Sequence, residues 1–248
     1  MTTRDATDPG PGADRGAPVR PVLLTIDGPA GTGKSSVAHQ LAERLGLDFL
    51  DTGAMYRAAA LLAHRGEVDP ADGVAVAAAV ERAEIRFDWK ANPPEIQLDG
   101  VSVARAIRSL AVSEIVSTVA AHPEVREVLV EHQRRIAREH PRLVTEGRDQ
   151  GSVVFPDASL RFYLDADVHE RALRRARQLL STGAEVDVEA VARDIERRDQ
   201  IDTARATAPL IRPEGAIEID TTALDLQQVV ERLESIARER LADAGFRS

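Results

Sequence analysis

Apolar residues along this chain gather in short runs that alternate with longer amphipathic stretches. Short apolar runs bounded by turn residues predict buried strands, and apolar positions spaced three and four apart predict helices. The predicted strands cover residues 22–27, 47–50, 143–145, 160–164 and 216–219. A helix is predicted at 34–45, between the first two strands, where Gly46 ends the pattern, and another follows the last strand from Leu226 onward. Strands separated by helices predict an α/β fold with a five-stranded parallel sheet covered on both faces.

Two regions interrupt this alternation. From about residue 85 to 103, apolar residues occupy every second position around a central Asn-Pro-Pro turn, which predicts an antiparallel hairpin. Helical patterns flank the hairpin at 71–83 and 110–121, and a further helix is predicted at 123–140, where proline suits the first turn. The second region, 165–212, is rich in arginine and mostly helical in pattern.

The first predicted strand leads directly into a glycine-rich run, which reads Gly28-Pro29-Ala30-Gly31-Thr32-Gly33-Lys34-Ser35-Ser36. Its glycines let consecutive backbone N–H groups point inward, forming a nest at a helix N-terminus that prefers anionic oxygens. In such a phosphate-binding loop (P-loop), Lys34 reaches the β- and γ-phosphates and Ser35 ligates Mg²⁺. Because a strand precedes the motif and a helix follows it, the sequence predicts binding of a nucleoside triphosphate.

The bulk composition narrows the function classes. A chain of 248 residues suffices for one large domain or for a core with smaller inserts, and a net charge of -9 argues against a dedicated nucleic-acid binder. The chain has no cysteine, its six histidines lack zinc-ligand spacing, and it has no apolar run long enough for a membrane span. These features predict a cytoplasmic protein without a membrane partner. Residues 1–20, rich in Pro, Gly, Asp and Arg, are expected to form a disordered leader.

Several motifs, in the same order along the chain, resemble those of the bacterial cytidylate kinases. They are Leu50-Asp51-Thr52-Gly53-Ala54-Met55-Tyr56-Arg57, Ile107-Arg108, Val112-Ser113, Glu146-Gly147-Arg148-Asp149-Gln150-Gly151, Val153-Val154-Phe155-Pro156-Asp157-Ala158, Arg198-Asp199 with Asp202, Arg205 and Ala208-Pro209-Leu210, and Ile219-Asp220-Thr221-Thr222. The resemblance implies a P-loop core (21–68, 141–165 and 213–248), an acceptor-binding insert at about 69–140 and a helical lid at about 166–212. It also implies a monomer that transfers the γ-phosphoryl group of ATP, with Mg²⁺, to CMP or dCMP.

The same resemblance assigns residues to the acceptor side. It gives the 5′-phosphate to Arg57, Arg148 and Arg205, the cytosine edge to Ser117, Arg126 and Asp149, and the ribose to Arg198 and Asp202. Guanidinium groups grip phosphate oxygens in pairs and neutralise an anionic acceptor, which suits the first assignment. For the second, a carboxylate facing N4 and a guanidinium facing N3 and O2 complement cytosine, whereas uracil reverses two of those groups.

Lys34, Arg174, Arg175 and Arg205 are the expected catalytic groups. The two lid arginines, Arg174 and Arg175, are expected to close over the transferring phosphoryl group, because such reactions depend mainly on positioning and charge neutralisation. An acceptor phosphate is already an anionic nucleophile, so a general base is not required. Thr52 and Tyr56 are expected to line the acceptor pocket, with core packing as the equal alternative for Tyr56.

Some interpretations stay open at this level. Glu146 ends a predicted strand, where it either holds Mg²⁺ through water or is a plain strand-end charge. Gln150 stands where a hydrophobic residue is expected and Ser152 where threonine is usual, and both departures bear on local packing. Two other functions are alternatives: a kinase acting on a neutral hydroxyl, as in shikimate-type kinases, and a GTP-dependent switch, although the sequence lacks an Asn-Lys-x-Asp motif.

Overall fold

A parallel sheet forms the centre of the computed structural model, which describes residues 20–181, 183 and 185–243. The sheet has five strands in the order β2-β6-β1-β7-β8, and each neighbouring pair runs parallel. The strands are β1 (Val22–Asp27), β2 (Asp48–Asp51), β6 (Arg142–Glu146), β7 (Leu160–Asp165) and β8 (Ile217–Asp220). The predicted α/β fold and five-stranded parallel sheet are therefore confirmed, with every strand boundary within one residue of its predicted place.

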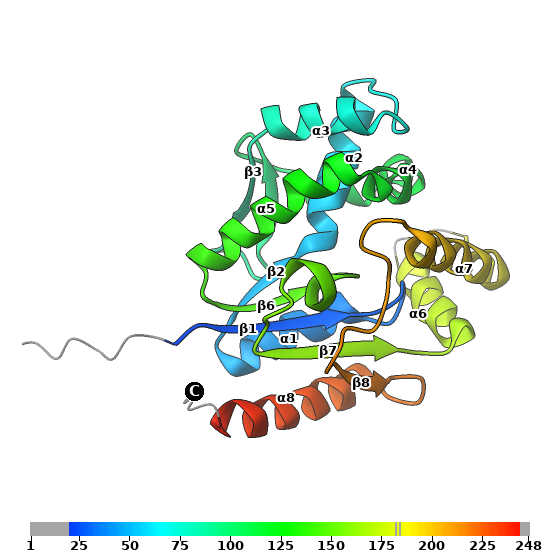
Figure 1. Ribbon diagram of the computed structural model, residues 1–248. Helices are drawn as coiled ribbons and strands as arrows, with labels where there is room; N and C mark the ends of the chain where they lie inside the picture. Colours follow the sequence, from blue (N-terminus) through cyan, green and yellow to red (C-terminus); the bar gives the residue numbers. More distant parts are fainter. Residues whose placement is uncertain (1–19, 182, 184, 244–248) are drawn as a thin grey trace, which may run out of the picture.

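Helices cover both faces of this sheet (Figure 1). On one face, α1 (Lys34–Leu45) and α8 (Leu226–Asp243) enclose an apolar cluster with the strands. On the other face lie α2 (Thr52–Arg65) and α5 (Pro123–Glu139). Because both faces are buried, the strands read as nearly continuous apolar runs. The parallel arrangement brings the carboxyl ends of all five strands to one edge, where ligands of open α/β sheets bind.

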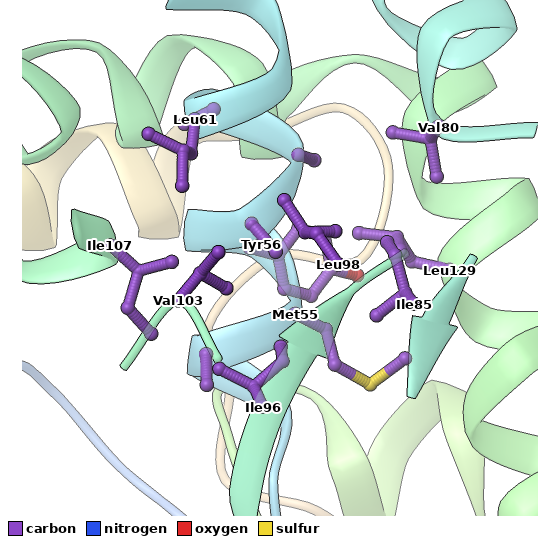
Figure 2. Close-up of a cluster of buried hydrophobic side chains, with 14 of the residues drawn as sticks. Met55, Tyr56, Leu61, Val80, Ile85, Ile96, Leu98, Val103, Ile107 and Leu129 are labelled. Carbon is purple, nitrogen blue, oxygen red and sulfur yellow. The ribbon is translucent and has the colours of Figure 1, made fainter. Parts of the chain in front are cut away.

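The expected insert contains a second, smaller sheet. Its elements are α3 (Gly73–Arg82), β3 (Ile85–Asp88), β4 (Glu95–Leu98), β5 (Val101–Ser102), the short 3₁₀ helix η1 (Ala106–Arg108) and α4 (Leu110–Ala121). Strands β3 and β4 form the predicted antiparallel hairpin, and β5 adds a third strand that the pattern does not predict. Figure 2 shows how Ile96 and Leu98 of this sheet face Met55 and Tyr56 of α2, so the insert shares a core with the helix that follows β2.

Two helices stand beyond the carboxyl edge of the main sheet (Figure 1). They are α6 (Val168–Leu180) and α7 (Val188–Ala204), and they pack against each other. A single turn of π-helix, η2 (Gln150–Val154), follows β6 at the same edge. None of the described helices is long and apolar enough to cross a membrane. The predicted disordered leader lies, apart from Arg20, outside the described residues.

Candidate active site

The P-loop connects β1 to α1 and adopts a backbone with positive φ, which favours glycine, at three of its positions. Gly28 has φ of 147°, and a Cβ there would lie 2.0 Å from the carbonyl oxygen of Leu164. Gly31, with φ of 82°, is the second such position, because a Cβ there would press on Arg171. Gly33 caps α1 in the left-handed conformation with no side-chain hydrogen bond, so the first N–H groups of α1 are left for a ligand.

Lys34 lies inside this loop with its charge poorly compensated. Its side chain is buried, and Nζ donates to the carbonyl oxygen of Pro29 at 2.7 Å. Burial, and then the positive charge of Arg148, lower the pKa of Lys34 to about 7. An ammonium group whose charge is disfavoured in this way gains most from an anionic ligand, as its expected role on phosphate requires.

Beside the P-loop, one hydroxyl and two carboxyl groups meet. Ser35 Oγ donates to Glu146 Oε1 at 2.7 Å, and Asp51 pairs with Glu146 in the register of β2 and β6. Burial, and then the adjacent Glu146, raise the pKa of Asp51 to about 7. Burial and the neighbouring carboxyl group both disfavour the charge of Asp51, and a divalent cation would offset both, so the donor set suits Mg²⁺.

Within the described ranges, no group of three or more histidine, cysteine, aspartate or glutamate side chains is arranged to hold a metal by itself. Mg²⁺ commonly keeps waters and substrate phosphates among its ligands and takes only one or two carboxylates from the protein. The combination of Ser35, Asp51 and Glu146 matches that habit.

An ion pair connects two of the predicted phosphate-binding segments. Arg148 Nε, on the loop after β6, donates to Asp202 Oδ2 at 3.0 Å on α7. Burial lowers the pKa of Arg148, but the charges of Asp202 and Glu146 outweigh it and raise that pKa above its usual value. Arg205 lies beside the same aspartate, with its Nη2 3.7 Å from Asp202 Oδ1. The structure thus brings Arg148, Asp202 and Arg205 together.

Arg205 has a donor that the protein does not use. Its side chain is 5% exposed, and Nε donates to the carbonyl oxygen of Asp202 at 3.2 Å, whereas Nη2 has no hydrogen-bond partner among the described residues. Burial is the main cause that lowers the pKa of Arg205. A buried guanidinium nitrogen without a hydrogen bond is costly, and an anionic ligand that accepted from it would remove that cost.

Arg57 approaches the same region from α2. Its Nη1 donates to Ser113 Oγ at 3.0 Å and to the carbonyl oxygen of Ile107 at 3.2 Å. Burial, followed by the charges of Arg198 and Arg175, lowers the pKa of Arg57 to about 10. Arg198 in turn donates to the carbonyl oxygen of Ser113 at 3.3 Å. Arg108 is a third positive charge that acts on Arg57. Positive charge is therefore concentrated here, on four guanidinium groups: Arg57, Arg108, Arg175 and Arg198.

Arg126 and Asp149, the predicted base-reading residues, form a buried ion pair. Arg126 Nη2 donates to Asp149 Oδ2, and the two side chains are 4% and 3% exposed. The Arg126 guanidinium also lies 5.3 Å from the centre of the Tyr56 ring. Tyr56 is buried in the insert core, and its hydroxyl has no hydrogen-bond partner within the described part of the chain. Both sequence interpretations of Tyr56, core packing and pocket lining, therefore have support.

The remaining acceptor-side predictions fare unevenly. Thr52 is buried, and its Oγ1 donates to the carbonyl oxygen of Glu146 at 2.6 Å, which fixes the ends of β2 and β6 to each other. Ser117 lies half-buried on α4, one turn beyond Ser113. Hydrogen bonds and ion pairs among the described residues connect Ser117 to none of the other candidates, so its role stays a prediction.

The two predicted lid arginines occupy different surroundings. Arg174 donates to Thr221 Oγ1 at 3.0 Å and to the carbonyl oxygen of Leu224 at 3.3 Å, and it reaches the carbonyl oxygen of Thr32 at 3.5 Å. These bonds anchor it between the P-loop and the segment after β8. Arg175 instead lies within electrostatic reach of Arg198, and burial, followed by the charge of Arg198, lowers its pKa. Closure of both over one phosphoryl group stays a prediction.

Several residues at the site were not among the sequence candidates. Asp51 and Ser113 stand within or beside quoted motifs, but their partners come from β6 and α2. Arg171 and Asp199 contact the P-loop from α6 and α7. Two of them could have been found from the sequence by their neighbours, because Asp199 directly follows the candidate Arg198 and Asp51 directly precedes the candidate Thr52.

A P-loop at the carboxyl edge of a parallel sheet, faced by clustered arginines, defines a P-loop phosphotransferase. Comparison with known proteins is more specific. The family model described as Cytidylate kinase matches residues 24–239. The chain is 43% identical over 222 residues to the cytidylate kinase of Nocardia farcinica, which covers 90% of this chain and 96% of that protein. It is 45% identical over 218 residues to that of Caldanaerobacter subterraneus subsp. tengcongensis, covering 88% and 95% of the two chains. The chain therefore belongs to the cytidylate kinase family, whose members are kinases.

A third relative, the cytidylate kinase of Geobacter sulfurreducens, is 42% identical over 221 residues, covering 89% of this chain and 94% of that one. Among solved structures, shikimate kinase from Bacteroides thetaiotaomicron is 13% identical with a TM-score of 0.45, covering 88% of this chain and 98% of that chain. That likeness is too distant to bear on the substrate.

Proposed function

We propose that this protein transfers the γ-phosphoryl group of ATP to CMP and dCMP, giving ADP with CDP and dCDP. The observation that carries the proposal is the buried Arg126–Asp149 pair, which directly adjoins Arg148 in the chain and so places base-reading groups next to a phosphate-binding arginine. The activity of the named relatives supports the same substrate. The alternative with a neutral hydroxyl acceptor finds less support, since it has no use for several clustered arginines.

On the donor side, the P-loop N–H groups and Lys34 are proposed to hold the β- and γ-phosphates of ATP. Ser35, with Glu146 and Asp51, is proposed to hold Mg²⁺ on those phosphates. Mg²⁺, when bound, would neutralise charge that develops between the β- and γ-phosphates. Lys34 would regain its full charge on contact with the triphosphate, because that contact offsets the burial that lowers its pKa.

On the acceptor side, Arg57, Arg148 and Arg205 are proposed to hold the 5′-phosphate of CMP. These residues neutralise the acceptor and so let one anion approach another. Arg205 contributes most in the transition state, because its Nη2, which makes no hydrogen bond within the described residues, can donate to charge that develops there. The proposed contacts of Arg198 and Asp202 with the ribose, and of Ser117 with the base, complete the pocket.

Asp149 and Arg126 are proposed to choose the base. Asp149 would accept from the N4 amino group of cytosine, and Arg126 would donate to N3 and O2. UMP would bring O4 against the carboxylate and N3–H against the guanidinium. In a buried site such a mismatch leaves polar groups unpaired, which strongly disfavours binding.

The proposal also includes the setting of the reaction. We place it in the cytoplasm, on free nucleotides, and take the protein to act as a monomer without nucleic-acid or membrane partners. A net charge of -9 supports the exclusion of nucleic acid, because a polyanion would be repelled.

The test is a coupled assay of purified protein with Mg-ATP and one acceptor at a time: CMP, dCMP, UMP, AMP or shikimate. We expect CMP and dCMP to be turned over at least about 100-fold more efficiently than UMP. Lys34→Ala should lower the rate with CMP by about 100-fold or more, because it removes a charge aimed at the transferring group. Equal turnover of CMP and UMP would contradict the base assignment, and faster turnover of shikimate would contradict the acceptor class.

A further inference from the structure

Two oppositely charged residues, one from α6 and one from α7, hold the P-loop residue Ala30 by hydrogen bonds. Asp199 Oδ1 on α7 accepts from the backbone N–H of Ala30 at 3.1 Å. Arg171 Nη1 on α6 donates to the carbonyl oxygen of the same Ala30 at 2.9 Å and to Asp199 Oδ2 at 2.5 Å. One P-loop residue is thus held at both its N–H and its carbonyl group by a single ion pair.

The Arg171–Asp199 ion pair is largely buried, and a further hydrogen bond fixes Arg171. The side chains of Arg171 and Asp199 are 5% and 19% exposed, and Arg171 Nε donates to the carbonyl oxygen of Ala166 at 3.0 Å. Gly31, the next P-loop residue, packs tightly on this side, since a Cβ there would lie 3.1 Å from Arg171 Cβ and 3.2 Å from the Arg171 carbonyl oxygen. Removing either partner of this largely buried ion pair would leave the other charge uncompensated, which is costly.

On α7, Asp199 lies between two residues of the acceptor side. The residue before it, Arg198, donates to the Ser113 carbonyl oxygen of the insert, and Asp202, one turn later, pairs with Arg148. The acceptor-side residues of α7 therefore flank the one that holds the donor loop. Any movement of α7 relative to Ala30 must displace Arg198 and Asp202 as well, because a helix moves as a rigid element.

We propose that Asp199, braced by Arg171, is a positioning residue that couples the two substrate sites: it aligns α7 with the P-loop, so that nucleotide on the P-loop strengthens binding of the acceptor nucleotide. This inference rests on the proposed function. In this proposal, bound ATP orders the P-loop, and the P-loop orders α7 through Ala30. Arg198 and Asp202 on α7 are then already in place for the acceptor, so its binding carries no further ordering cost. By reciprocity, the acceptor should tighten binding of ATP by the same factor.

The pair is suited to this task because its charges cancel. Asp199 alone would place a negative charge beside a loop that binds a triphosphate, and Arg171 neutralises it at 2.5 Å. The alignment therefore adds little net repulsion to the donor site.

The test measures CMP affinity by titration calorimetry with and without the non-hydrolysable analogue AMP-PNP and Mg²⁺. The ratio of the two affinities is the coupling factor. We expect about fivefold or more for the unmodified protein, and close to one for Asp199→Ala. Binding of CMP alone should stay within about twofold, because Asp199 is not among the residues proposed to hold the acceptor. Asp199→Asn keeps an oxygen for the Ala30 N–H and should restore part of the coupling.

Glu196→Ala is the matched control, since Glu196 is an exposed acidic residue on the same helix, one turn earlier. It should leave the coupling factor unchanged. If Asp199→Ala does not fold, Asp199→Asn and Arg171→Lys decide the matter, because both keep hydrogen-bonding groups while weakening the ion pair. A coupling factor in these variants equal to that of the unmodified protein would overturn the inference. So would a factor of one in the unmodified protein. Failure of the unmodified protein to phosphorylate CMP is a separate outcome, which would reject the proposed function instead.

Discussion

Arg148 Nε donates to Asp202 Oδ2 at 3.0 Å, and this contact joins the loop after β6 to helix α7 across 54 residues of sequence. Arg148 lies two residues after Glu146, and the Glu146 carboxylate accepts a hydrogen bond from Ser35 at the start of α1. A short chain of contacts therefore runs from the donor site to the acceptor site.

The first prediction concerns that contact. Asp202→Asn should raise the KM for CMP by about tenfold, because a neutral amide no longer holds the Arg148 guanidinium in place, and a hydrogen bond to a charged group contributes roughly 1.5–3 kcal/mol. The KM for ATP should change by less than about twofold, since no hydrogen bond or ion pair within the described residues joins Asp202 to the P-loop. Steady-state kinetics with each substrate varied in turn decides this. Equal increases in both KM values would show that Asp202 acts on the whole fold rather than on the acceptor side.

The second prediction concerns base choice. Asp149→Asn should reduce kcat/KM for CMP by about 100-fold, because removing one partner of a buried ion pair costs roughly 3–5 kcal/mol, part of which falls on the bound state. The efficiency with UMP, already low, should fall much less, so that the ratio of CMP to UMP efficiency shrinks. Competition assays with both acceptors present measure the ratio directly. A ratio that stays constant would place Asp149 outside the base pocket.

Local pattern was enough to predict most of the fold. The strand Val22–Asp27 and the helix Lys34–Leu45 have the predicted boundaries, because a buried strand and an amphipathic helix each carry a distinct period. Helix α2 (Thr52–Arg65) was not predicted. Its alanines at 58, 59, 60 and 63 are all fully buried, so the helix is apolar nearly all round and shows no clear stripe. Strand β5 was not predicted either, because it has only two residues, both exposed, and so leaves no alternating pattern.

The site was harder to predict where it depends on long-range pairing. The P-loop is contiguous in sequence, so its chemistry could be assigned from Lys34 and Ser35 alone. The carboxyl pair of Asp51 and Glu146 depends on which strands are neighbours, which no single segment encodes. The same holds for Asp199 on Ala30, separated by 169 residues.

Gln150 illustrates a departure whose meaning only the structure supplies. The residue is fully buried, accepts from Thr145 Oγ1 at 3.0 Å and donates from Nε2 to Gln133 Oε1 at 3.1 Å. A polar residue is tolerated in this otherwise apolar position because its amide has partners on both sides.

The third prediction concerns Arg205. Arg205→Lys should lower both kcat and the affinity for CMP, with a combined loss in kcat/KM of about 10- to 100-fold, because lysine keeps the charge but loses the planar pair of donors. Arg197→Lys is the matched control, since Arg197 is an exposed arginine of helix α7, which ends directly before Arg205, and its ion pair to Asp194 lies on the surface. It should behave as the unmodified protein. Full activity of Arg205→Lys would mean that Nη2 of Arg205 does not meet the acceptor phosphate.

The last prediction concerns Asp27, at the end of β1. Its carboxylate is fully buried and accepts from the backbone N–H groups of Gln150 at 2.8 Å and Gly151 at 2.7 Å, so it ties the P-loop strand to the acceptor loop. Burial is the main cause that raises the pKa of Asp27 to about 6. Between its ordinary pKa of 3.8 and about 6, the folded protein therefore holds a proton that the unfolded chain releases. Stability contributed by this group must fall as pH rises through that window.

Asp27→Asn removes this titration. The free energy of unfolding of the unmodified protein, minus that of the variant, should therefore decrease between pH 4.5 and pH 6.5, by at most about 1.4 kcal/mol for each pH unit. Above that range the difference should become constant. Urea unfolding followed by circular dichroism at several pH values measures it, and using the difference cancels the titration of all other groups that the substitution leaves alone. A difference that rises with pH would show that the Gln150 and Gly151 N–H groups, which favour the ionised form, outweigh burial at this site.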